Sequence, residues 1–328
     1  NSTVQMLDKD FNLIMFPGAV LEKSAASYLL NLSGITDRKV NILGPSAKVM
    51  DDGGYLIQSN STQSKVDIFV DVGIMSSCNF SFAYKNREVK EQYNVKLCEG
   101  RNTCSFYAGT ADVSGQSQAE DKNVLINIDQ VYVVDSIANN GQGIFRPFYS
   151  GFSGMVRSDV SVNINQAYIE NKHVDGGGIQ VYFFNESDDH GTPHDINYAI
   201  NFGYLQVKLA AEYIQHYPSD PNNPAYQFMT FRGEQYNAKF SVHADEAIII
   251  GQSIANDHRG DGNLSDSTEL IFSGNWEFKN AIPFDPRQGN TRNCNTCVMT
   301  FDGNFKVDST FARFDLDMNF DVTFRGEI

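Results

Sequence analysis

Hydrophobic and polar residues alternate with a period of two along most of this chain. The longest alternation lies near the C-terminal end, with apolar residues at Phe314, Leu316, Met318, Phe320, Val322 and Phe324 and polar ones at Asp315, Asp317, Asn319, Asp321 and Thr323. Successive side chains of a β-strand point to opposite faces of its sheet. This run therefore predicts a long antiparallel strand with an apolar inner face and an acidic outer face.

The same alternation predicts many further strands. They are expected around residues 66–72 and 160–164, and over residues 124–134, 179–184, 198–209, 236–242, 246–250 and 270–278. Clusters of Gly, Asn, Asp and Pro separate them. We expect an all-β fold, an antiparallel β-sandwich, jelly roll or barrel, because many strands with turn-rich joints are typical of these folds. At most two short helices are expected, over residues 19–30 and 209–217.

A Phe-x-Gly triplet occurs five times. Its glycines are Gly154, Gly233, Gly274, Gly303 and Gly326. In a strand, Gly permits a bulge or sharp bend while Phe fills the adjoining core. Because the spacing is irregular, we interpret the triplets as corners of a curved sheet and not as a solenoid or propeller repeat.

The chain of 328 residues is long enough for two domains of ordinary size. A stretch rich in Gly and aromatic residues, 138–154, predicts a boundary between an N-terminal β-rich domain, residues 1–145, and a C-terminal one, residues 146–328. A single large β domain with a long connection is the alternative.

Charge and composition exclude some partners. The net charge of −15 would repel a phosphate backbone, so no nucleic-acid partner is expected. No segment reaches the roughly 20 apolar residues of a spanning helix. Residues 1–10 do not resemble a signal peptide, so an exported protein would be present here in its mature form. We expect an extracellular or cell-surface location, and a cytosolic protein that never had a signal peptide is the alternative. Six N-glycosylation sequons would suit a secreted glycoprotein but decide little, because a chain this rich in Asn, Ser and Thr produces several by chance.

The five cysteines offer two candidate disulfides. Cys98 and Cys104 flank a short polar segment and could staple a hairpin across its turn. Cys294 and Cys297 lie in a polar loop that could close a small disulfide ring. Free thiols are the second interpretation and zinc the third, because one CxxC lacks the second closely spaced pair of a zinc site.

Two polar loops could bind metal. His190 and His194 stand among three aspartates, although Gly191 and Pro193 indicate a loop without the helical geometry of a zinc enzyme. The second loop offers oxygen ligands for calcium at Asp257, Asp261, Asn263 and Asp266. Ordinary solvated turns are the alternative for both, and calcium is the one cofactor that the sequence suggests.

No catalytic motif is present, so the sequence favours a non-catalytic protein. We expect an adhesion protein or an assembly subunit of a filament or coat, which binds a glycan, a protein or its own copies through loops and sheet edges. One alternative is a barrel or sandwich that binds haem or a lipid for uptake. Another is a carbohydrate-active enzyme whose two carboxylates meet only in the folded chain.

Overall fold

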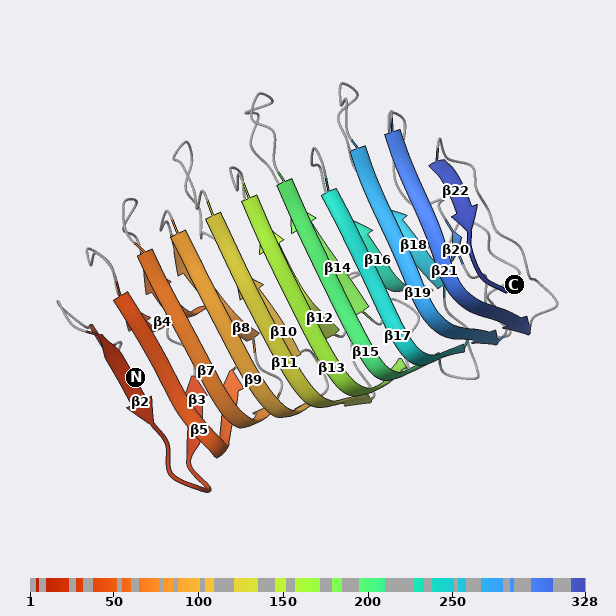
Figure 1. Ribbon diagram of the computed structural model, residues 1–328. Coiled ribbons are helices and arrows are strands. Elements are labelled where there is room, and N and C mark those ends of the chain that lie inside the picture. The colour runs from red at the N-terminus through yellow and green to blue at the C-terminus, as the bar shows by residue number, and fades with distance from the viewer. Residues whose placement is uncertain are drawn as a thin grey trace.

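The chain folds into parallel β-strands that alternate between two sheets (Figure 1). The computed structural model describes 22 strands together with Asp10 and residues 15–19 and 325–327, and none of these described residues lies in a helix. The larger sheet contains β2 (Phe11–Ile14), β3 (Val20–Lys23), β5 (Arg38–Asp51), β7 (Lys65–Ser76), β9 (Glu88–Gly100), β11 (Asp121–Val134), β13 (Arg157–Asn171), β15 (Asp195–Leu209), β17 (Ala238–Ile250), β19 (Ser267–Lys279), β21 (Thr296–Asp308) and β22 (Phe320–Phe324). The smaller sheet contains β1 (Val4–Gln5), β4 (Tyr28–Asn31), β6 (Tyr55–Ser59), β8 (Asn79–Tyr84), β10 (Cys104–Ala108), β12 (Phe145–Gly151), β14 (Ile179–Phe184), β16 (Gln227–Arg232), β18 (Ser253–Asp257) and β20 (Phe284–Asp285).

This arrangement is a β-solenoid. From β5 to β20, one long strand of the larger sheet and one short strand of the smaller sheet form a coil, and each coil stacks in parallel on the one before it. The predicted antiparallel sandwich or barrel is therefore wrong. Alternation identifies the buried face of a strand but not the direction of its neighbour. A solenoid buries only the inner faces of its parallel strands, so its outer faces stay polar, as in an antiparallel sheet.

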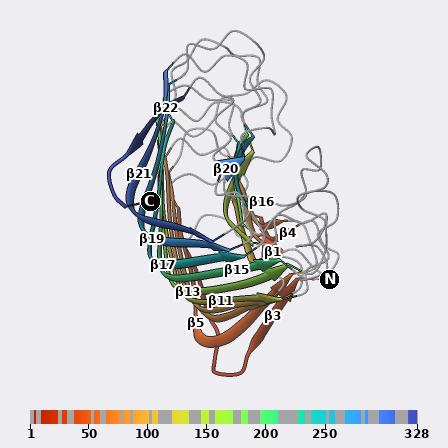
Figure 2. The ribbon, with the colours of Figure 1, turned by 90° about the vertical axis from the view of Figure 1, so that its right-hand side faces the viewer.

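Each long strand bends near its middle. In β11 the buried Ile128 and Val131 are separated by two exposed residues, Asp129 and Gln130, where strict alternation would place one. We call the part of each long strand before this bend the first arm and the part after it the second arm. Figure 2 shows the smaller sheet facing the first arms, while the second arms close one side of the solenoid.

Stacked rows of inward side chains form the core. One row runs through Ile126, Val162, Ile200, Val242 and Phe272, all at most 1% exposed. Every coil adds one member to each row, so the apolar core extends along the solenoid axis.

The last coils stack phenylalanine on phenylalanine and glycine on glycine. The ring centroids of Phe272 and Phe301 lie 5.6 Å apart, and those of Phe301 and Phe324 lie 5.0 Å apart. Two residues later, Gly274 (φ +95°) and Gly303 lie in register at the bend. The expected bends are confirmed at these glycines, but the exclusion of a solenoid was wrong, because the loops between coils differ in length and hide the repeat.

Three other local predictions change. Residues 20–23 and 28–31, within the first predicted helix, form β3 and β4, while residues 210–217 of the second lie outside the described part. The C-terminal run is described only from Phe320, and there β22 runs parallel to β21, not antiparallel. The hairpin predicted at Cys98 and Cys104 is wrong, because β9 and β10 belong to different sheets.

The sheets continue across the predicted domain boundary. The larger sheet pairs β11 with β13, and the smaller one pairs β10 with β12 and β12 with β14. The division into two domains stays a prediction. Among the described residues, no helix is long and apolar enough to cross a membrane.

Candidate functional site: a trough on the first arms

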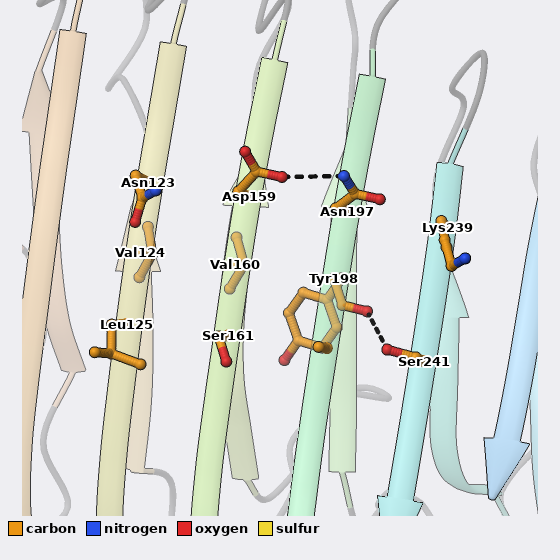
Figure 3. Close-up of a pocket in the computed structure, with 11 residues that line it drawn as sticks. Asn123, Val124, Leu125, Asp159, Val160, Ser161, Asn197, Tyr198, Lys239 and Ser241 are labelled. Atoms are coloured by element: carbon orange, nitrogen blue, oxygen red, sulfur yellow. Dashed lines mark hydrogen bonds between the residues drawn. The ribbon is translucent and has the colours of Figure 1, made fainter.

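A shallow cavity of about 430 Å³ lies on the outer face of the first arms (Figure 3). It crosses four neighbouring strands, β11, β13, β15 and β17, and so runs along the solenoid axis. We call it the trough.

Outward side chains at every second position shape the trough. Three rows in register are involved, and the register of the strand pairs aligns their members. The first wall consists of Asn123, Asp159, Asn197 and Lys239. The floor consists of Leu125, Ser161, Ala199 and Ser241. The next outward row, Asn127, Asn163, Asn201 and His243, follows the floor along each strand, just outside the residues that line the cavity, and we call it the second wall. The trough is hollow because its floor side chains are mostly smaller than those of the rows beside it.

Hydrogen bonds between coils hold the second wall in place. The Asn127 amide donates to the Asn94 side-chain oxygen at 3.0 Å, Asn163 donates to Asn127 at 3.0 Å, and Asn201 donates to Asn163 at 2.9 Å. We call this row the asparagine ladder. Each ladder amide has two donor hydrogens and two acceptor lone pairs, and each bond occupies one donor and one lone pair. The remaining capacity is available to a ligand or to water.

The row continues into the next coils with a histidine. His243 Nδ1 lies 2.9 Å from Ser273 Oγ, and Nε2 lies 3.1 Å from Asp245 Oδ1. The imidazole therefore has a polar neighbour at each ring nitrogen. These two contacts hold the His243 ring in place at the end of the second wall.

The charged groups of the first wall have partners of their own. Asn197 Nδ2 donates to Asp159 Oδ1 at 3.0 Å, and Lys239 Nζ pairs with Glu269 Oε2 at 3.1 Å. Among the described residues that line the trough, Asp159 carries the only carboxylate. The charged groups are therefore paired, and the rest of the lining combines neutral hydrogen-bonding groups with a larger apolar surface.

Tyr198 lies beneath the floor. Its side chain is 1% exposed and packs against Phe240 with ring centroids 6.2 Å apart. Burial raises the pKa of the Tyr198 phenol well above 10, so this group stays protonated at neutral pH. Its backbone carbonyl accepts a hydrogen bond from Ser241 Oγ at 3.4 Å, which helps to hold the floor.

A second outward cluster lies on the second arms. Tyr132 and Tyr168 stack with ring centroids 5.5 Å apart, and Tyr132 is 55% exposed. The Tyr168 hydroxyl donates to Glu170 Oε2 at 3.3 Å. Burial, followed by the Glu170 charge and this hydrogen bond, raises the pKa of the Tyr168 phenol above 10. This cluster lies beyond the bend from the trough.

The residues predicted to bind metal are not part of the trough. His190, His194, Asp261, Asn263 and Asp266 lie outside the described residues, and Asp257 is placed as the last residue of β18. Within the described part of the chain, no three His, Cys, Asp or Glu side chains gather as a metal site would require. The calcium and zinc interpretations stay predictions.

The cysteine predictions are placed only in part. Cys98 is fully buried in β9, Cys104 begins β10, and Cys297 lies in β21, whereas Cys294 is outside the described residues. Both disulfides stay predictions.

Sequence reasoning missed the trough, although a signal for it exists. The pattern apolar-Asn-apolar recurs at residues 126–128, 162–164 and 200–202, and the first two copies are followed by an acidic or amide residue and then Gln. The three asparagines are separated by 36 and 38 residues, and the structure places them side by side. Aligning these segments would have predicted stacked coils.

Neither a known protein family, nor a curated protein, nor a solved structure matches this chain. The geometry of the solenoid and its trough therefore provides the basis for inferring its function.

Proposed function

We propose that this protein is a non-catalytic, extracellular or cell-surface binding protein that attaches to a glycan through the trough. The observation that carries the proposal is the order of the outward rows: the hydrogen-bonding first wall and the asparagine ladder lie on either side of a floor of mostly small side chains, and the ladder borders the lining. Glycans present many hydroxyl groups that both donate and accept hydrogen bonds, and the amide side chain of Asn can pair with them in either role. The adhesion interpretation of the sequence supports the same function.

The distribution of carboxylates favours binding over hydrolysis. Glycoside hydrolysis in most enzymes requires two carboxyl groups on either side of the scissile bond. Asp159 has no second carboxylate beside it among the described lining residues, and its Oδ1 already accepts from Asn197. A rigid site that holds a sugar without cleaving it suits an adhesin, in which a static sheet presents the binding groups.

The direct test is binding to a panel of immobilised polysaccharides. Ala199→Phe would fill the floor at the centre of the trough, and we expect it to abolish retention of the glycan that the unmodified protein binds. Lys208→Phe is the matched control, because it adds the same outward ring to the same strand on the second arm. The control breaks only one surface ion pair, with an N···O distance of 3.9 Å to Glu170, and such pairs contribute little to stability.

The outcomes separate clearly. Loss of binding in Ala199→Phe with retention in Lys208→Phe supports the trough as the glycan site. Failure of the unmodified protein to bind any neutral or charged polysaccharide would refute the proposed function. Release of reducing sugars from a bound polysaccharide would replace it with a catalytic one.

A further inference from the structure

We infer that the ligand of the trough is a neutral, extended polysaccharide of β-1,4-linked pyranoses, which lies along the solenoid axis with one sugar on each coil. This inference rests on the proposed function and adds the class and orientation of the glycan. It follows from the spacing, charge and direction of the three rows.

The spacing of the rows sets the repeat of the ligand. Neighbouring strands of a sheet lie about 4.8 Å apart, so equivalent residues in the wall and floor rows recur at about that interval. Sugars joined through equatorial bonds form a straight chain with a repeat close to this spacing. Such a chain can present a ring to every coil without losing register, whereas a curved α-linked chain would leave the rows after one or two sugars.

The spacing of the outward rows across the strands agrees with a chain in this direction. The first wall and the asparagine ladder, which borders the lining, are four residues apart along each strand, as in Asn123 and Asn127, and this corresponds to about 13 Å in an extended strand. A sugar ring over the floor would direct hydroxyl groups from its two edges toward the two walls. Ala199 and the Ser161 and Ser241 Cβ atoms leave room for the ring itself.

The charge pattern argues for a neutral chain. Lys239 is the one cation among the described lining residues, and its Nζ is paired with Glu269 at 3.1 Å. Asp159 adds a negative charge to the same wall, and the chain as a whole carries −15. A polyanionic glycan would meet repulsion without a matching row of cations.

The test measures affinity against chain length. β-1,4-Glucan oligosaccharides from disaccharide to hexasaccharide are titrated by calorimetry, together with N-acetylglucosamine oligomers of the same linkage and α-1,4-glucan oligosaccharides as the curved control. We expect the affinity for one of the β-linked series to rise about three- to tenfold with each sugar, since each adds one or two net hydrogen bonds. The rise should end at the tetrasaccharide, because four strands form the trough.

A shortened protein sharpens this test. Asp121 and Arg157 occupy equivalent register positions in β11 and β13, so a variant lacking residues 121–156 would remove one whole coil. Its affinity plateau should move from the tetrasaccharide to the trisaccharide. Ala199→Phe provides a second variant should the deletion fail to fold, and it should remove the dependence on length.

The inference and the proposed function can fail separately. Three results would overturn the inference and leave a glycan-binding trough. The first is an affinity that does not depend on chain length, and the second is equal binding of α- and β-linked chains. The third is binding of anionic polysaccharides alone, provided that Ala199→Phe abolishes it. Absence of binding to every polysaccharide would overturn both.

Discussion

Glycine at the bend illustrates how single residues permit stacking. Gly274 has φ +95°, and a Cβ atom built there would overlap the backbone carbonyl oxygen of Ala244 in the preceding coil. The equivalent position of Gly303 faces the backbone of Gly274 in the same way. A side chain at either position would push two coils apart.

We therefore expect Gly274→Ala to lower the free energy of unfolding by more than about 1 kcal/mol, because it adds a steric clash to an unfavourable φ. Gly18→Ala is the control, since Gly18 also has a positive φ, +79°, but no atom lies within 4 Å of the new Cβ. Urea denaturation of both variants separates the cost of the steric clash from the cost of the positive φ. Equal destabilisation would mean that the backbone angle alone, and not close approach of the coils, requires glycine.

The exposed charge cluster at Glu277 gives a prediction about pH. Lys306 Nζ lies 2.7 Å from Glu277 Oε1, and Lys279 Nζ lies 2.9 Å from Oε2. The hydrogen bonds from these two lysines lower the pKa of the Glu277 carboxyl. A carboxyl with a lowered folded-state pKa stabilises the fold above its unfolded pKa, and this contribution is lost as the pH falls through the folded value.

Lys306→Met should accordingly raise the pKa of Glu277 toward its ordinary value of about 4.3. NMR titration of the Glu277 carboxyl carbon in both proteins measures the change directly. Lys239→Met, which breaks a different cation–carboxylate pair, is the control and should leave the Glu277 titration unchanged. A Glu277 pKa that did not move in Lys306→Met would show that the ion pair is not formed in solution.

At the scale of the element, the asparagine ladder ties neighbouring strands together through side chains as well as backbone. Asn163 is central, because it donates to Asn127 and accepts from Asn201. Each coil thereby gains a register-specific contact in addition to its apolar rows. A shift by one residue would place the amides opposite inward, apolar positions.

Asn163→Ala removes two of these hydrogen bonds, so we expect the free energy of unfolding to fall by about 1–2 kcal/mol. The comparison is Asn41→Ala in β5, which removes one bond, the donation from Asn41 to Asn12 at 2.7 Å, and should cost about half as much. Thermal unfolding followed by circular dichroism measures both. If Asn163→Ala proves as stable as the unmodified protein, water replaces the ladder without loss.

For the whole molecule, nearest-neighbour stacking is the organising interaction. Described long strands contact the strands immediately before and after them in the larger sheet. The stability of such a protein is approximately a sum over coils and the interfaces between them. Removal of one internal coil should then preserve the fold.

The variant lacking residues 121–156 tests this expectation. It would stack β13 directly on β9, and the new neighbours are compatible, since Val160 would follow Glu91 as Val124 does, and Asn163 would follow Asn94 as Asn127 does. We expect a β-rich circular dichroism spectrum, cooperative unfolding and a modestly lower melting temperature. A shuffled variant of the same length is the control and should not fold. Collapse of the deletion variant into aggregates would show that the coil formed by β13 and β14 cannot stack directly on the coil formed by β9 and β10.

The sequence by itself determined the all-β class and, in the segments with clear alternation, which side chains are buried. Val160, Val162 and Ile164 are buried as their alternation predicts, because the period of two is a local property of an extended backbone. The absence of a basic stripe and of a spanning apolar segment can likewise be read directly from composition.

Tertiary structure alone decided the direction of the strands, the partners in each sheet and the trough. Extra residues interrupt the alternation at the bends of the long strands, as Asp129 and Gln130 do in β11, and this signal is easily taken for a strand end. Asn94, Asn127 and Asn163 meet although 33 and 36 residues separate them, because stacking of coils depends on position within the coil and not on the length of the connecting loop. Binding surfaces of a solenoid are therefore assembled from residues that are distant in sequence, and only the stacked backbone brings them together.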